Sequence, residues 1–114
     1  YRTTHALIGE KPMIVIDWAA PFSLDTSYET ERGVVKAEAE AAEDAAEWIR
    51  AAFEEPYLVG LFTCQLVGRH GNDRWFPEGR MKRTLLRDDG TPFPIRTARI
   101  AKANKAALPR IFEK

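Results

Sequence analysis

The sequence predicts an α/β fold with a parallel sheet, and three observations carry that prediction. Two short, nearly continuous apolar runs occupy residues 13–17 and 57–67. A segment with helical spacing of its apolar residues lies between them, at 34–53, and a second one follows at 95–112. Because a helix that joins two strands in this order makes a right-handed crossover, we expect the two strands to be parallel neighbours.

The first apolar run begins after Lys11-Pro12 and ends at the carboxylate of Asp17. A short run without alternation is typical of a parallel strand buried on both faces. From Trp18 to Gly33 the chain shows neither a helical nor an alternating period, so we expect a long loop there. Long loops that follow strands often carry function.

The segment at 34–53 predicts a helix that packs on the sheet through small side chains. Its stripe consists of Val35, Ala39, Ala42, Ala46, Ile49 and Phe53. Glutamates and an aspartate occupy the opposite face, and Pro56 stops the helix. The alanines allow the helix to lie close to the strands.

The second run, residues 57–67, is rich in β-branched and aromatic residues and predicts the second strand, which Gly68 ends. Residues 68–94 contain four glycines and three prolines and predict a second long loop, with a candidate short hairpin around Met81 and Leu85. The helix predicted at 95–112 contains Pro109, which we expect to end or bend it.

Length and composition limit the possible classes. A chain of 114 residues with 45% hydrophobic content suits one domain. It has no apolar run of the roughly 20 residues that a membrane span needs and no signal-peptide pattern, so we expect a soluble segment. Cys64 is the single cysteine, which excludes an internal disulfide and a cysteine metal cluster. We predict no cofactor. One cysteine does not indicate whether the protein works in a reducing or an oxidising compartment.

The net charge of zero conceals an asymmetry along the chain. Residues 1–67 carry 5 basic and 12 acidic side chains, and residues 68–114 carry 12 basic and 5 acidic ones. The bases near residues 80–87 suggest nucleic-acid binding, but no recognised module accompanies them and the pI is near 6.9. Solvated helix faces and pairing between the two helices explain the asymmetry better.

The candidate site lies where the two strands end, because ligands of parallel α/β sheets bind at the carboxyl edge. The predicted site residues there are Asp17, Trp18, Arg69, His70 and Trp75. Asp17 is either a catalytic or binding carboxylate or a strand-end cap that accepts backbone N–H bonds. Trp18 and Trp75 suit stacking on sugar rings or, alternatively, core packing. His70 with Asp73 is too small a set for a metal, so we predict no metal site.

Three ordered motifs resemble those of retaining barrel glycoside hydrolases, with the agarase-like enzymes as the nearest family. Residues 9–18 (GEKPMIVIDW) are similar to the family's seventh strand, and 53–62 (FEEPYLVGLF) to the entry of its eighth. Residues 87–93 (RDDGTPF) resemble the segment before the last helix, and 100–104 (IAKAN) that helix itself. The order is more specific than any single motif.

The resemblance implies that residues 1–114 form one segment: two consecutive β/α units of a parallel TIM-type barrel, the C-terminal portion of a polysaccharide-acting glycoside hydrolase. Asp17 then stands at the nucleophile position, where the family has Glu, and Phe62 stands where Trp is usual. The family's acid/base is outside this chain, so no hydrolysis is expected from the chain alone. The rest of the barrel, or another copy, would complete the sheet. The alternative is a non-catalytic carbohydrate-binding relative.

Overall fold

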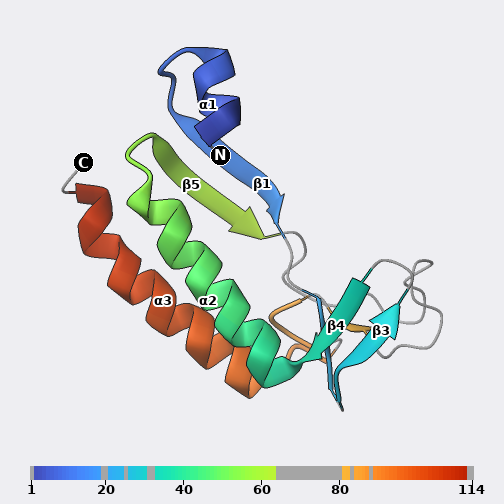
Figure 1. Ribbon diagram of the computed structural model, residues 1–114. Coiled ribbons are helices and arrows are strands. Elements are labelled where there is room, and N and C mark those ends of the chain that lie inside the picture. Colours follow the sequence, from blue (N-terminus) through green and yellow to red (C-terminus); the bar gives the residue numbers. More distant parts are fainter. Residues whose placement is uncertain are drawn as a thin grey trace.

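The computed structural model describes residues 2–18, 21–24, 26–30, 33–63, 81–82, 84–87 and 89–112. Over those residues the chain forms three helices and six strands (Figure 1). The helices are α1 (Arg2–Ile8), α2 (Glu38–Glu54) and α3 (Pro94–Phe112). The strands are β1 (Met13–Trp18), β2 (Phe22–Ser23), β3 (Tyr28–Thr30), β4 (Gly33–Ala37), β5 (Leu58–Thr63) and β6 (Met81–Lys82).

The two predicted apolar strands pair in parallel, as the sequence indicated. Ile14 lies opposite Gly60 and Val15 opposite Leu61, with irregular register on either side of these pairs. The backbone N–H of Met13 donates to the carbonyl of Tyr57 at 2.8 Å, which fixes the start of the pairing. The strand pair and its helical crossover are therefore confirmed.

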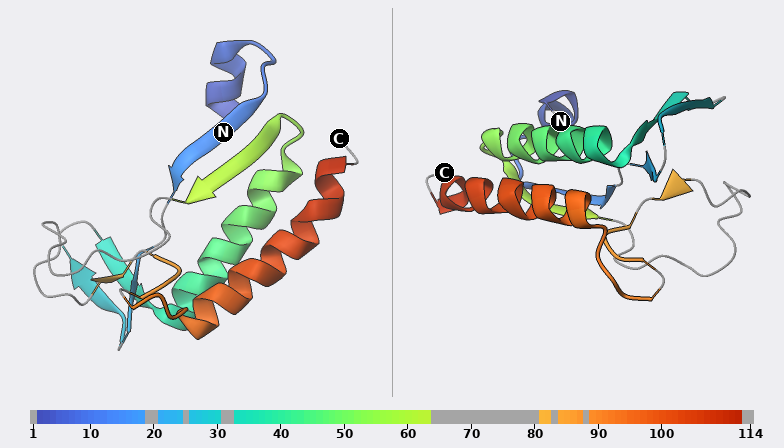
Figure 2. Two further views of the ribbon diagram at one scale, coloured as in Figure 1. Left: turned by 180° about the vertical axis from the view of Figure 1, so that it is seen from behind. Right: turned by 90° about the horizontal axis from the view of Figure 1, so that it is seen from below.

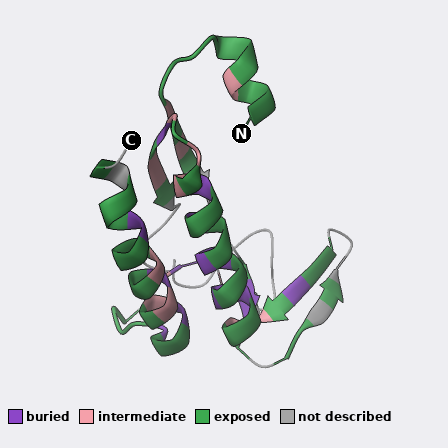
Figure 3. Ribbon diagram, turned by 60° about the vertical axis from the view of Figure 1, so that its left-hand side comes forward, coloured by how far each residue is buried: buried purple, intermediate pink, exposed green. Residues whose placement is uncertain are grey.

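Helices α2 and α3 lie side by side along one face of this strand pair (Figure 2). Val15 and Leu61 point into that layer and pack against a buried cluster from both helices. The cluster consists of Ala45, Ile49, Ile100 and Ala107. Buried positions follow the sides of the helices that face each other and the strands (Figure 3). Ala42 and Ala46 of the predicted stripe are buried there, but Ala39 is exposed, and the stripe missed the buried alanines Ala41, Ala45 and Ala52.

The helix ends follow local chemistry. Acidic Glu38 and Glu40 lie in the first turn of α2, where the helix dipole favours negative charge. Pro94 opens α3, at the position where its missing N–H costs nothing. Pro109 lies inside α3 and does not end it, because the helix continues to Phe112.

Ion pairs connect the acidic helix to the basic one. Arg99 of α3 binds Glu43 of α2 through two guanidinium nitrogens, and Arg110 Nη1 donates to Glu54 Oε1 at 3.0 Å. The hydrogen bond from Arg99 is the main cause that lowers the pKa of Glu43. The predicted pairing between the two helices is confirmed.

A second sheet, of four short strands, occupies the region predicted to be a loop. Its order is β3-β4-β2-β6, with β2 parallel to β4 and the other neighbours antiparallel. Phe22 and Ser23 of β2 are fully buried. The Phe22 ring meets the edge of Phe93 with centroids 5.0 Å apart. The first predicted loop is thus partly strand, and the helix predicted from Val34 begins at Glu38 instead.

The prediction of two consecutive β/α units of a TIM-type barrel is wrong. In the described part of the chain the parallel sheet has two strands, and the strands between β1 and α2 leave it to form a separate mixed sheet. A barrel unit instead runs from strand to helix with all strands in one sheet. Over the described residues, the fold is a smaller mixed α/β arrangement of three helices and two sheets.

Helix α1 was also absent from the prediction. It has no buried residue, and it contacts the rest of the chain through the ring of His5, which stacks on Tyr57 at 3.7 Å between centroids. Arg2 Nε donates to Glu55 Oε1 at 2.7 Å. None of the helices in the described ranges has the length and apolar character that crossing a membrane requires.

Candidate functional site

The carboxyl ends of β1 and β5 meet at one edge of the parallel strand pair. Trp18, the last residue of β1, lies opposite Thr63, the last residue of β5. Asp17 precedes Trp18 within β1, so its backbone is at this edge. The crossover helix and the parallel register together bring about this placement.

The structure places two of the five predicted site residues. Asp17 and Trp18 are in β1, and their side chains lie outside the described part. Arg69, His70 and Trp75 fall within residues 64–80, which are outside the described residues altogether. The predicted grouping of these five side chains therefore stays a prediction.

An exposed aromatic ring lies next to this edge. Phe62 is 59% exposed, on the face of the strand pair that the helices do not cover. Its ring covers Gly60, where an added Cβ would lie 3.0 Å from Phe62 Cε2 and 3.5 Å from Ile14 Cγ2. Any side chain at position 60 would displace the ring. The sequence analysis noted Phe62 only because the resembling family has Trp there. An aromatic ring so close to the strand end is itself a candidate for stacking on a sugar.

A buried cation in the first turn of α3 lies against β2 and was missed by sequence reasoning. Arg96 is fully buried, and its guanidinium carbon lies 4.8 Å from the centroid of the Phe22 ring. None of its three guanidinium nitrogens has a hydrogen-bond partner among the described residues. Burial lowers the pKa of Arg96 to about 10, and the carboxylate of Glu38 acts in the opposite direction.

Glu38 of α2 binds the first turn of α3 at the backbone of Arg96. Its Oε1 accepts the backbone N–H of Arg96 at 3.0 Å, which satisfies one of the free donors in the first turn of the helix. The carboxylate thus caps α3 from α2. Its role is structural, and nothing about the position of Glu38 indicates catalysis.

Metal chemistry finds no support in the described ranges, which contain no cluster of three or more histidine, cysteine, aspartate or glutamate side chains suited to an ion. A pocket lies elsewhere, in the groove between α2 and α3, and basic residues line it.

No family model, curated protein or solved structure matches the chain.

Proposed function

We propose that the protein acts on a polysaccharide, with Asp17 as the carboxylate of its site. The observation that supports this most is the parallel pairing of β1 with β5, which leaves Asp17 at the carboxyl edge of the strands. This is the edge at which α/β proteins bind ligands. The ordered motifs shared with agarase-like glycoside hydrolases support the substrate class.

The chemistry of Asp17 bears on the type of reaction. Aspartate places its carboxylate about 1.5 Å further back than glutamate, since it has one methylene fewer. Retaining glycosidases hold their two carboxyl groups roughly 5 to 5.5 Å apart, and inverting ones roughly 6.5 to 9.5 Å. A shorter side chain widens the separation, which favours hydrolysis with inversion over a covalent intermediate.

The second candidate is carbohydrate binding without hydrolysis. The specific observation in its favour is the same replacement, because an aspartate at the family's nucleophile position also suits a protein that has kept the sugar site and lost the chemistry. The exposed ring of Phe62 serves either function.

The test is reducing-sugar release from agar and other polysaccharides by the full-length protein, with binding measured on the same glycans. We expect release that Asp17→Asn lowers by about 100-fold or more, as loss of a reacting carboxylate should. Glu47→Gln, which removes an exposed carboxylate on α2, should leave release unchanged.

The stereochemistry of the product separates inversion from retention, and Asp17→Glu should alter the rate. Binding without release, weakened by Asp17→Asn, would establish the second candidate in place of the first. The absence of both binding and release on every glycan tested would overturn the proposal.

A further inference from the structure

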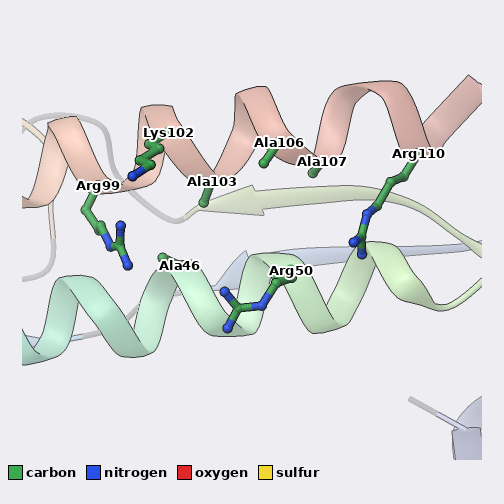
Figure 4. A pocket seen from close by; sticks show the side chains of 8 residues that line it. All are labelled: Ala46, Arg50, Arg99, Lys102, Ala103, Ala106, Ala107 and Arg110. Carbon is green, nitrogen blue, oxygen red and sulfur yellow. The ribbon is translucent and has the colours of Figure 1, made fainter.

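The groove between α2 and α3 holds a pocket that is independent of the proposed polysaccharide site. Its volume is about 140 Å³, and Figure 4 shows its lining residues on the two helices. Four alanines form its apolar part: Ala46, Ala103, Ala106 and Ala107. One water takes roughly 30 Å³ of liquid, so the pocket has room for a group of several heavy atoms.

The remaining lining residues are all cations. Arg50 comes from α2, and Arg99, Lys102 and Arg110 come from α3. Two of them are neutralised, because Arg99 pairs with Glu43 and Arg110 with Glu54. Arg50 and Lys102 have neither an ion pair nor a hydrogen bond to any residue in the described ranges.

The acids on α2 do not cancel this charge. Glu43 feels the positive charges of Arg50 and Lys102 in addition to Arg99, and all of these lower its pKa. Three cations thus surround one carboxylate, which leaves a surplus of two positive charges. Glu47 lies three residues before Arg50 on α2 but makes no ion pair with it within the described residues, and with Glu40 and Asp44 it raises the pKa of Lys36.

We propose that this pocket binds a tetrahedral oxyanion, a phosphate or sulfate group, through Arg50 and Lys102 with help from Arg99. A doubly charged anion matches the surplus of two charges, whereas a single carboxylate would leave one cation unpaired. Guanidinium forks donate two parallel hydrogen bonds to such an anion, and a lysine adds a compact charge. The alanines leave the space in which the anion would sit.

Titration calorimetry at constant ionic strength tests the proposal with four probes: inorganic phosphate, inorganic sulfate, glucose 6-phosphate and glucose 6-sulfate. We expect saturable binding of one anion per chain. Tighter binding of the esters identifies a sugar-linked group as the ligand, and equal or tighter binding of the free anions identifies the inorganic ion. The double variant Arg50→Met/Lys102→Met should weaken binding by about tenfold or more, since both unpaired donors are lost.

The matched control is Lys11→Met/Lys105→Met, which changes the net charge equally at two exposed lysines outside the pocket. It should weaken binding much less than the pocket variant does, because neither lysine side chain lines the pocket. The charge-keeping exchange Arg50→Lys/Lys102→Arg should keep most of the affinity. Equal weakening by the two double variants, or no saturable binding of any probe, would overturn the site.

Discussion

The two buried clusters that the described residues form differ in chemistry and in how clearly the sequence predicts them. Ala45, Ile49, Ile100 and Ala107 form an aliphatic cluster beneath the parallel strands. Phe22, Ala41 and Phe93 form an aromatic cluster at the second sheet, beside the buried Arg96. Helix α2 passes through both, with Ala41 in one and Ala45 in the other. The comparison shows that a single helix can join a regular core to an irregular one.

The largest expected effect tests whether the two clusters unfold together. Phe22→Ala should lower the free energy of unfolding by about 3 to 5 kcal/mol, because it leaves a cavity in the aromatic cluster. If α2 couples the clusters, hydrogen exchange at residues 45–50 should accelerate along with exchange at β2. Protection that persists at 45–50 while β2 exchanges freely would show two independent units.

The control for this experiment is Ile16→Ala, which truncates a side chain that is 72% exposed on the uncovered face of β1. A change within about 0.5 kcal/mol is expected there, as for surface positions generally. A loss comparable to that of Phe22→Ala would mean that something covers this face in solution.

A smaller change in stability, and an increase instead of a loss, is expected at Arg96, which lies beside the aromatic cluster. Arg96→Met should raise the free energy of unfolding by about 1 kcal/mol at pH 7, because it removes buried guanidinium donors for which the described residues provide no acceptor. Urea denaturation measures this change. The ring contact with Phe22 opposes the gain, so a loss of stability would mean that the contact outweighs the desolvation.

The pH dependence of this variant has a definite sign. Burial lowers the pKa of Arg96 to about 10 in the folded protein, below its ordinary value in the unfolded chain, so the unfolded chain binds more protons between the two pKa values. The wild type therefore recovers stability as pH rises through this window. The advantage of Arg96→Met should be full below about pH 10 and smaller at about pH 11.

The smallest expected effect concerns the exposed pairs that tie the helices of the aliphatic region. Because Arg99 lowers the pKa of Glu43, the pair stabilises the fold above the unfolded pKa near 4.5 and loses this contribution as pH falls below it. The urea midpoint of Glu43→Gln should lie slightly below that of the wild type at pH 7. The two midpoints should converge as the pH falls well below 4.5, once the carboxyl is protonated in both states, and a difference that persists there would rule out the carboxylate charge as its cause.

The sequence revealed the aliphatic region because its signals are long. Apolar runs and helical spacing predicted the two strands and the two helices, and the crossover rule then makes the strands parallel. The predicted burial was only partly right, because Ile14 and Ile16 are exposed where burial on both faces was expected. The second sheet has strands of two to five residues, too short to show a period. Strand β2 amounts to Phe22 and Ser23, a pair without any pattern, and its burial depends on Phe93 from far along the chain.

The candidate sites also differ in whether the sequence predicts them. The position of Asp17 at a strand end could be read from the sequence, because the strand itself is local. The pocket could not be predicted from the sequence. Arg50 and Lys102 are 52 positions apart, and their proximity depends on how α2 packs against α3. Arg96 was missed because charged residues are rarely fully buried. Its burial depends on Phe22 of β2, which is far from it in the sequence.

The uncovered face of the parallel strand pair has a consequence for how the chain avoids aggregation. Ile14, Ile16 and Phe62 are exposed beside strands that, within the described residues, have a neighbour on one side only. Such edges are templates for adding foreign strands. Lys11-Pro12 precedes β1, and Glu55-Pro56 lies just before β5. A charge and a proline beside an apolar strand act as gatekeepers against intermolecular pairing, so the residues that introduce each strand also protect the chain while it folds.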